Sequence, residues 1–430
     1  MRVNLKTLGC RLNEAELESW AQQLQADGHQ IVRDCGDADL VILNSCAVTQ
    51  DATKKSRYLI RQAHRENPRA KLVVSGCYAS LNPEEVGASL GVDMVVDNAD
   101  KSRLIEIVRE KLDLTSMPVF STEPGEISLF TLGRQRAFVK VQDGCRYRCT
   151  FCIVTIARGE EKSRPIREIV SEINTLHGQG VQEVVLTGVH LGGYGSEINL
   201  RLEHLLAVVL ESTSIPRLRL GSLEPWELTD EFFDLLRNPR LMPHLHLPLQ
   251  SGSDSVLKRM ARRCKTAEFA ELVERARQTA PDINITTDVI VGFPGETEEE
   301  WQESLKFIEH MDFGHIHIFC YSAREGTHAA RLENQVPHPI KRARSQALQR
   351  LTQNFKRKVL GRFLGRTLPV LWEDSKETTA DGRRRIFGYT PNFLRVETLA
   401  DPGQEVTSRI EPATLGSIAQ TGTHFMAELT

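Results

Sequence analysis

The sequence predicts an α/β protein with three successive parts: an N-terminal parallel-sheet α/β domain, a central partial (βα)6 barrel and a small C-terminal β-barrel. Short β-branched runs alternate with amphipathic helical segments from Met1 to about Val108, as in a parallel sheet with crossover helices. Six strand-like runs between Ala137 and Ser322, all but the last followed by a helical segment, continue this alternation in a curled sheet. Short strands with polar turns follow a basic stretch, which is typical of a small barrel.

Length and composition limit the class of protein. At 430 residues the chain is too long for one typical core, and we expect domains at residues 1–118, 131–361 and 362–430. No apolar run approaches the roughly 18 residues of a membrane span. The N-terminus runs directly into a strand and has no long apolar signal region. We therefore expect a cytoplasmic protein without a membrane partner.

Three cysteines of the N-terminal part follow three predicted strands, of which the second and third are Leu40–Leu43 and Leu72–Val74. The carboxyl ends of strands in an open parallel sheet share one edge, so Cys10, Cys46 and Cys77 should converge there. Nine cysteines, an odd number, in a reducing compartment favour metal ligation over disulfides. The alternative is that each is a small buried apolar residue, as free cysteine often is.

The run from Gly144 to Cys152 places Cys145, Cys149 and Cys152 in one short loop after the first barrel strand. A structural zinc site needs four protein ligands and a cubane iron–sulfur cluster needs one ligand for each iron. Three cysteines therefore leave one position open, where an iron can bind a substrate or cofactor. The aromatic Phe151 directly precedes the last cysteine of the loop.

The carboxyl ends of the other barrel strands carry polar or glycine-rich segments, which should form one concave rim. Thr187, Glu224 and Gln250 can hydrogen-bond an amino acid moiety or a ribose, whereas Gly188 and Gly292 allow backbone to approach a ligand closely. The alternative is that the glycines only form turns. Histidines alternate along the predicted strands, and we interpret them as barrel-lining or packing residues: His190, His244, His246, His315 and His317.

The last third of the chain combines a basic stretch with a predicted β module. Between Glu333 and Glu373 there is no acidic residue, and such a one-signed segment attracts polyanions. Arg383–Arg385 stand near Phe387, Tyr389 and Phe393, which pairs phosphate-binding charge with surfaces for stacking bases. A solvated helix face and an aromatic core are the alternative explanation. The predicted strands are Thr367–Leu371, Arg385–Tyr389, Phe393–Val396, Glu405–Ile410 and Phe425–Leu429.

The cysteine loop and three further motifs resemble the methylthiotransferases of the radical S-adenosylmethionine (SAM) superfamily. The motifs are Thr7–Glu16 (TLGCRLNEAE), Gly188–Gly195 (GVHLGGYG) and His244–Asp254 (HLHLPLQSGSD). They are most similar to the branch that acts on threonylcarbamoyladenosine beside the anticodon of tRNA. Two loops depart from the family pattern: Thr155 and Ile156 replace a proline and an aromatic residue, and Cys320–Gly326 lacks prolines that relatives often show.

The resemblance implies a radical SAM barrel between an N-terminal methylthiotransferase domain and a C-terminal, RNA-binding TRAM domain. It implies two 4Fe–4S clusters, a SAM-binding one on Cys145, Cys149 and Cys152 and an auxiliary one on Cys10, Cys46 and Cys77. SAM is then a cofactor, and the expected partners are a tRNA substrate and an electron donor such as flavodoxin or ferredoxin, with no DNA. SAM contacts are expected from the rim and the loop: Phe151, Thr187, Gly188, Glu224, Gln250 and Gly292.

The implied reaction is methylthiolation of carbon 2 of N6-threonylcarbamoyladenosine. Within the same enzyme class, isopentenyladenosine in tRNA and an aspartate of a ribosomal protein remain alternative substrates. In a different class, a non-catalytic RNA-binding protein with zinc in both cysteine sites also remains open.

Overall fold

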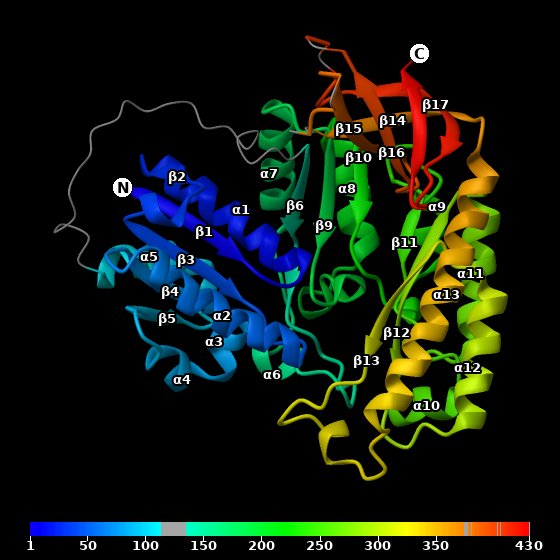
Figure 1. Cartoon of the computed structure of the whole chain (residues 1–430), viewed down its shortest axis with the longest axis horizontal. Helices are drawn as coiled ribbons and strands as arrows, with labels where there is room; N and C mark the ends of the chain where they lie inside the picture. The colour runs from blue at the N-terminus through cyan, green and yellow to red at the C-terminus, as the bar shows by residue number, and fades with distance from the viewer. Residues whose placement is uncertain (113–134, 374–376, 380, 402, 405, 430) are drawn as a thin grey trace.

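The computed structural model describes residues 1–112, 135–373, 377–379, 381–401, 403–404 and 406–429. Three bodies surround a common centre in Figure 1: the N-terminal domain in blue, the barrel in green and yellow, and the C-terminal barrel in red. This architecture confirms the predicted fold class. The predicted domain limits at residues 118 and 131 lie outside the described residues, and the domain division stays a prediction.

The N-terminal domain is a five-stranded parallel sheet in the order β2-β1-β3-β4-β5. Its central strand β3 is buried on both faces, because Val41 and Leu43 pack into one apolar cluster and Leu40 and Ile42 into the other. Continuous β-branched and leucine runs are what two covered faces require. The strands are β1 (Arg2–Thr7), β2 (Gln30–Val32), β3 (Leu40–Ser45), β4 (Lys71–Gly76) and β5 (Met94–Val96); the helices are α1 (Arg11–Ala26), α2 (Gln50–Glu66), α3 (Cys77–Leu81), α4 (Pro83–Gly87) and α5 (Leu104–Lys111).

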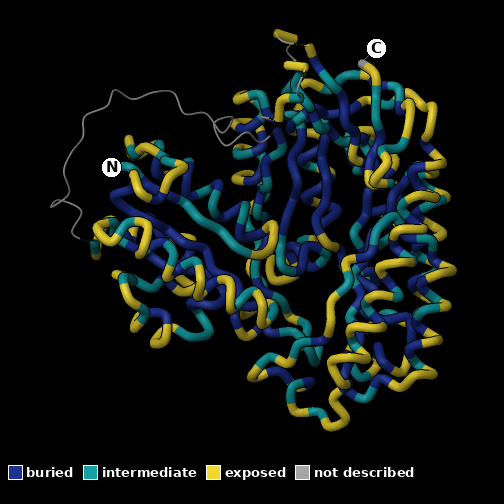
Figure 2. Tube along the Cα trace, in the orientation of Figure 1, coloured by how far each residue is buried: buried dark blue, intermediate teal, exposed yellow. Residues whose placement is uncertain are grey.

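The central barrel consists of two three-stranded parallel sheets, β10-β9-β6 and β11-β12-β13. Isolated bridges Leu218–Leu241 and Ser222–His246 join the two sheets. The barrel thus contains the six strands that the sequence predicts. Figure 2 shows that the barrel strands are mostly buried, whereas exposed residues gather on the outer helices. The strands are β6 (Arg136–Lys140), β9 (Glu183–Thr187), β10 (Arg217–Leu220), β11 (His244–His246), β12 (Asn284–Val291) and β13 (His315–Cys320); the main helices are α6 (Val154–Arg158), α7 (Ile166–Gly178), α8 (Leu202–Ser212), α11 (Thr266–Thr279) and α12 (Glu298–Met311).

The C-terminal module is a closed barrel in the order β14-β15-β16-β18-β17. The runs predicted at 393–396 and 405–410 are wrong in position, because the corresponding strands β16 and β17 begin later, at Arg395 and Ile410. Phe393 (φ +64°) and Ser408 (φ +65°) adopt left-handed turn conformations, so each strand begins only beyond them. The strands are β14 (Thr367–Glu373), β15 (Arg384–Tyr389), β16 (Arg395–Ala400), β17 (Ile410–Ile418) and β18 (Phe425–Leu429).

Helix α13 (His338–Phe363) is the basic segment, and it leads from the central barrel to the C-terminal one (Figure 1). Leu348 and Phe355 pack into the core of the central barrel, whereas Leu360 and Phe363 pack into that of the C-terminal barrel. Across the described part of the chain, no helix is both long and apolar enough to cross a membrane.

Candidate functional site

Cys10, Cys46 and Cys77 come together at the carboxyl edge of the N-terminal sheet. Cys10 directly precedes α1, Cys46 follows β3, and Cys77 opens α3 after β4. Their strands β1, β3 and β4 are neighbours in the sheet, and the three cysteines line one large cavity. The structure thus brings the predicted auxiliary site together, and the role of these thiols as cluster ligands stays a prediction.

Two glycines allow these cysteine loops to lie so close together. Gly9 has φ +116°, and a Cβ there would lie 2.7 Å from Cys46 Sγ. Gly76 has φ +97°, and a Cβ there would lie 2.2 Å from the carbonyl oxygen of Ser45. Residues with a side chain rarely adopt this backbone conformation. A larger residue at either position would therefore separate the strand ends and open the cysteine site.

The first cysteine site is linked to the second by one asparagine. Asn98 Nδ2 donates to Cys77 Sγ at 3.8 Å and to the carbonyl oxygen of Ala157, in α6, at 2.7 Å.

Burial, with Cys77 and Cys10 adding to it, raises the pKa of Cys46 to about 11. This thiol therefore holds its proton until a metal displaces it.

Cys145, Cys149 and Cys152 share a tight loop between β7 (Gln142–Asp143) and α6. Cys145 N donates to the carbonyl oxygen of Gly159 at 3.2 Å, and Cys152 N donates to that of Cys149 at 3.0 Å. Burial raises the pKa of Cys145 to about 12 and that of Cys152 to about 11, and neighbouring cysteines of the loop add to both shifts. The loop geometry gathers the second predicted triad as the sequence suggested.

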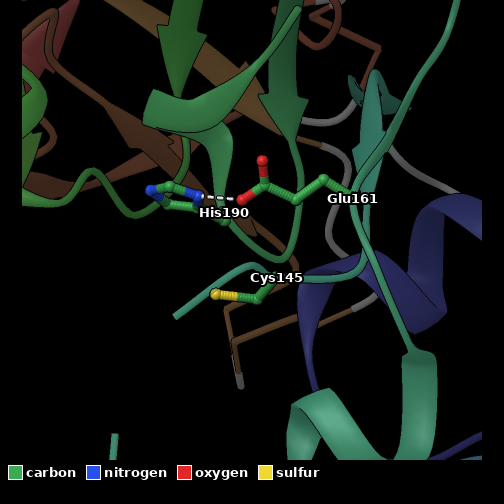
Figure 3. Close-up of side chains that lie close together, drawn as sticks. All are labelled: Cys145, Glu161 and His190. Carbon is green, nitrogen blue, oxygen red and sulfur yellow. Dashed lines mark hydrogen bonds and ion pairs between the residues drawn. The ribbon is translucent and has the colours of Figure 1, made fainter. Parts of the chain in front are cut away.

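Glu161 and His190 anchor this loop, and their side chains point toward each other beside Cys145 in Figure 3. Glu161 Oε1 accepts a hydrogen bond from Arg146 N at 3.0 Å and lies 2.5 Å from His190 Nδ1. His190 Nε2 lies 3.4 Å from Glu227 Oε1. Burial opposes protonation of the imidazole, but the two carboxylates raise the pKa of His190 overall. Sequence analysis predicted that His190 lines the barrel or packs in it; the side chain is indeed buried, and the structure adds its contacts with Glu161 and Glu227.

Arg262 contacts both Glu224 and Cys149 of the second triad. Glu224 Oε2 lies 2.8 Å from Arg262 Nη2, while Arg262 Nη1 lies 3.9 Å from Cys149 Sγ. Only 4% of the Arg262 side chain is exposed. A buried guanidinium thus balances a carboxylate and a thiol at once, and it would stabilise the thiolate that metal binding requires.

The other predicted SAM contacts fall in different places. Thr187 ends β9, Gly188 follows it, and both line the large cavity. Phe151 instead packs against a separate small apolar cluster. Gln250 and Gly292, beyond β11 and β12, have left-handed φ values of +73° and +71° and do not line that cavity. The structure does not bring these residues onto one wall, and their contact with SAM stays a prediction.

A cavity of about 650 Å³ lies where the three parts of the chain meet. The N-terminal cysteines and Arg11 form one wall, and inward-facing residues of the barrel strands form another. Tyr389, Phe393 and Arg395 of the C-terminal barrel contribute a third. The volume is in the range of pockets that enclose a small ligand.

A buried network of charges joins the two cysteine loops, and sequence analysis missed it. Glu16 Oε1 lies 3.0 Å from Arg158 Nη1, and its Oε2 lies 2.5 Å from Lys101 Nζ. Arg158 also donates to Asn13 Oδ1 at 2.8 Å and to Asp143 Oδ1 at 3.0 Å. Although burial opposes ionisation, Lys101 and Arg158 hold the pKa of Glu16 well below its usual range. The only signal in the sequence is position: Asn13 and Glu16 lie inside the motif Thr7–Glu16, and Arg158 follows the second cysteine loop.

The spacing of the thiols does not suit a single zinc ion bound by all three cysteines of a triad. Two groups of described residues have three ligand atoms within 4.8 Å of one another, and neither is a cysteine triad. Two sulfurs bound to one zinc are at most about 4.6 Å apart, which is twice the zinc–sulfur distance. At least one pair of sulfurs in each triad therefore lies too far apart to bind the same zinc ion, while three thiols are the donor set of a cluster with one free iron.

One of these groups, His246, Asp288 and His317, lies on the cavity wall. His246 Nε2 lies 3.2 Å from Asp288 Oδ1, and its Nδ1 lies 2.9 Å from Thr286 Oγ1. Both ring nitrogens are therefore engaged by protein groups. This placement agrees with the sequence interpretation of the histidines as barrel-lining residues.

Two family models match the chain. One is described as the Radical SAM superfamily and matches residues 139–308, and the other is described as Uncharacterized protein family UPF0004 and matches residues 2–97. The first match contains the loop with Cys145, and the second contains the three cysteines of the N-terminal site.

Curated relatives extend the similarity over most of the chain. Threonylcarbamoyladenosine tRNA methylthiotransferase MtaB of Thermotoga maritima is 37% identical over 380 residues, covering 86% of each chain. The protein of the same name from Bacillus subtilis is 36% identical over 405 residues, covering 92% of this chain and 89% of its own. The tRNA-2-methylthio-N(6)-dimethylallyladenosine synthase of Staphylococcus haemolyticus is 34% identical over 388 residues, covering 87% of this chain and 75% of its own.

Among solved structures, the radical S-adenosylmethionine methyltransferase TsrM from Kitasatospora setae is similar with a TM-score of 0.56 at 17% identity. The alignment covers 76% of this chain and 77% of that one, and it shows the fold alone. The curated relatives decide the family, because they match the N-terminal cysteine domain together with the barrel. The chain belongs to the radical SAM methylthiotransferase family.

Proposed function

We propose that this enzyme methylthiolates carbon 2 of N6-threonylcarbamoyladenosine next to the anticodon of tRNA, giving 2-methylthio-N6-threonylcarbamoyladenosine. The observation that carries the proposal is the cavity of nucleotide size that Cys10, Cys46 and Cys77 line. The relatives named MtaB from Thermotoga maritima and Bacillus subtilis support this substrate, because their names state an action on threonylcarbamoyladenosine in tRNA.

The two cysteine triads support a proposal for two cofactor sites. Cys145, Cys149 and Cys152 would hold the cluster that binds SAM, and Cys10, Cys46 and Cys77 would hold the auxiliary cluster. When bound, these groups supply the radical chemistry and the sulfur that replacement of an unactivated aromatic hydrogen requires. The chain itself positions the loops: Arg262 balances Cys149, and Glu161 fixes the backbone beside Cys145.

The C-terminal barrel and α13 would bind the RNA. Tyr389 and Phe393 stack on each other at 4.7 Å between ring centroids, and both line the cavity. Sequence analysis grouped them with Arg383–Arg385 as one binding surface, but the two rings face inward. On α13, Arg342, Arg350 and Arg357 are exposed and available for phosphates.

Two further partners follow from the chemistry. Reductive cleavage of SAM needs an electron donor, such as flavodoxin or ferredoxin. A tRNA substrate is met in the cytoplasm, and we place the enzyme there.

The direct test is mass spectrometry of nucleosides from total tRNA of cells with and without this protein. We expect the methylthio form of threonylcarbamoyladenosine to disappear and its precursor to accumulate. Re-expression of the wild type should restore the product, whereas a Cys145→Ala variant at equal abundance should not. Unchanged tRNA nucleosides would refute the proposal.

The alternatives give different results in the same cells. Loss of the methylthio form of isopentenyladenosine, or of a modified ribosomal-protein aspartate, would keep the reaction but change the substrate. Zinc in place of iron in the anaerobically purified protein would point to the non-catalytic RNA-binding alternative.

A further inference from the structure

Arg11 lies beside the three cysteines of the predicted auxiliary site. It directly follows Cys10 and is the first residue of α1. It lines the central cavity together with the auxiliary cysteines, and its side chain is exposed to that space. Its guanidinium carbon lies 5.8 Å from the ring centroid of Phe138 and 5.6 Å from that of Phe393. Cation–π attraction at such distances holds the charge without neutralising it.

Within the described residues, Arg11 has no directly bonded partner of opposite charge. Among the described residues, no acidic side chain forms an ion pair or hydrogen bond with it. Glu14 and Glu183 attract Arg11 electrostatically without a hydrogen bond to it, and Glu183 is committed to Arg136 and Arg219 at 2.5 Å and 2.8 Å. Asp288, on the cavity wall, is paired with His246. The planar donors of the Arg11 guanidinium therefore face the cavity and suit a planar anion such as a carboxylate.

The chemistry of the substrate places a carboxylate in this region. In N6-threonylcarbamoyladenosine, carbon 2 and the substituted carbon 6 are both bonded to N1 of the same ring. A residue beside the sulfur-delivering cysteines is thus also near the N6 substituent. The threonylcarbamoyl group ends in a carboxylate, whereas the dimethylallyl group and an unmodified adenosine offer no charge there.

We propose that Arg11 binds the carboxylate of the threonylcarbamoyl group and thereby selects the nucleoside that this enzyme modifies. The inference rests on the proposed function, because it identifies a specificity residue for that substrate. Two other anions share the chemistry, namely a tRNA phosphate and the carboxylate of SAM. The cysteines predicted to hold SAM do not line the cavity that Arg11 faces, and a phosphate would not distinguish the nucleoside.

The test measures binding of anticodon stem-loop RNAs to the full-length protein with its clusters reconstituted. Three RNAs are compared: one with threonylcarbamoyladenosine, one with its methyl ester, and one with unmodified adenosine. The wild type should bind the acid more tightly than the ester by roughly 10- to 100-fold, as a charge-assisted contact allows. Fluorescence anisotropy reads the dissociation constants, and the acid-to-ester ratio is independent of the active fraction of each preparation.

Arg11→Gln should bring this acid-to-ester ratio close to one, and Arg11→Lys should leave an intermediate ratio because it keeps the charge but loses the fork. Arg61→Gln, at an exposed arginine of α2 away from the cavity, is the matched control and should retain the wild-type ratio. Iron content of each variant reports whether the neighbouring cluster site is intact.

Three results would overturn the inference. Equal weakening of all three RNAs by Arg11→Gln would indicate a phosphate contact. A weaker SAM affinity with an unchanged ratio would indicate the SAM carboxylate. An unchanged Arg11→Gln protein would exclude any anion contact. Turnover of the acid RNA by the wild type tests the proposed function separately. If the wild type does not methylthiolate this RNA, the proposed function is refuted. If it does, and Arg11→Gln leaves the acid-to-ester ratio unchanged, only the inference about Arg11 is refuted.

Discussion

At the residue scale, the two cysteine triads differ in their surroundings. Cys10, Cys46 and Cys77 line the large cavity, whereas Cys145 precedes Arg146, whose backbone N donates to Glu161, the partner of His190. The first site therefore faces the cavity that we propose receives the nucleotide, and the second is set against protein charges. This difference favours sulfur delivery from the first site and SAM cleavage at the second.

Single substitutions should separate these two roles. Cys10→Ala should abolish methylthiolation yet leave part of the SAM cleavage to 5′-deoxyadenosine, while Cys145→Ala should lose both. Each variant should lose roughly four of the eight irons expected for two cubane clusters. Chromatography of one reaction mixture measures both the methylthiolated nucleoside and 5′-deoxyadenosine, and so tests whether the two roles separate. Equal loss of SAM cleavage in two folded variants would contradict the division of roles.

At the element scale, the site depends on how closely neighbouring strands end. Gly76 closes β4, and its backbone approaches Ser45 at the end of β3 more closely than any side chain permits. The geometry of the auxiliary site is thus set by a strand end rather than by the cysteines themselves.

Gly76→Ala should therefore damage the cluster site without touching a thiol. The strain of a positive φ and the overlap with Ser45 should destabilise the fold by about 1–3 kcal/mol, and iron should fall toward half. Gly178→Ala is the control, because a Cβ at that helical position meets no atom within 4 Å; its stability should stay equal or rise. Denaturant unfolding and iron analysis measure both effects. Full iron loading of Gly76→Ala would show that the strand ends can relax.

Part of this organisation is readable from the sequence. The barrel strands and the cysteine triads follow from β-branched runs and from the spacing of unusual residues. β17 was misplaced because Pro412 and Gly416 interrupt its pattern, yet Pro412 lies in a strand of the closed barrel. Glu16 and Arg158 could not be predicted, since charged residues normally face water and only three-dimensional packing buries them.

At the scale of the whole molecule, one buried acid connects two of the three parts. Glu183 Oε1 lies 2.5 Å from Arg136 Nε and 2.8 Å from Arg219 Nε, and its Oε2 lies 3.8 Å from Arg217 Nη1. Arg217 in turn donates to the carbonyl oxygens of Pro369 and Tyr389 in the C-terminal barrel. The acid therefore supports both the barrel sheet and the docking of the C-terminal barrel.

Glu183→Gln should be strongly destabilising, by about 3–5 kcal/mol, because it leaves three arginines around a neutral group. Glu231→Gln removes an exposed pair with Arg201 and should cost less than about 1 kcal/mol. Urea unfolding at neutral pH compares the two variants with the wild type. Equal small losses would show that the arginines find other partners.

The same acid makes the stability depend on pH. Burial alone would favour the neutral acid, but Arg136 and Arg219 hold the pKa of Glu183 well below its usual range. Its contribution is thus present above the unfolded-state pKa of about 4.3 and declines as the pH falls below that value. The difference in unfolding free energy between wild type and Glu183→Gln should shrink from pH 7 to pH 3. A constant difference would contradict the depressed pKa.

Helix α13 belongs to two hydrophobic cores, since Leu348 serves the central barrel and Phe363 the C-terminal one. A cut at the predicted boundary between residues 361 and 362 would leave Leu360 on one fragment and Phe363 on the other, although both complete the same core. Chimeras that exchange C-terminal barrels between relatives should therefore cross over upstream of Val359. For protein engineering, as for recombination during evolution, the end of the helix and the barrel form one transferable unit.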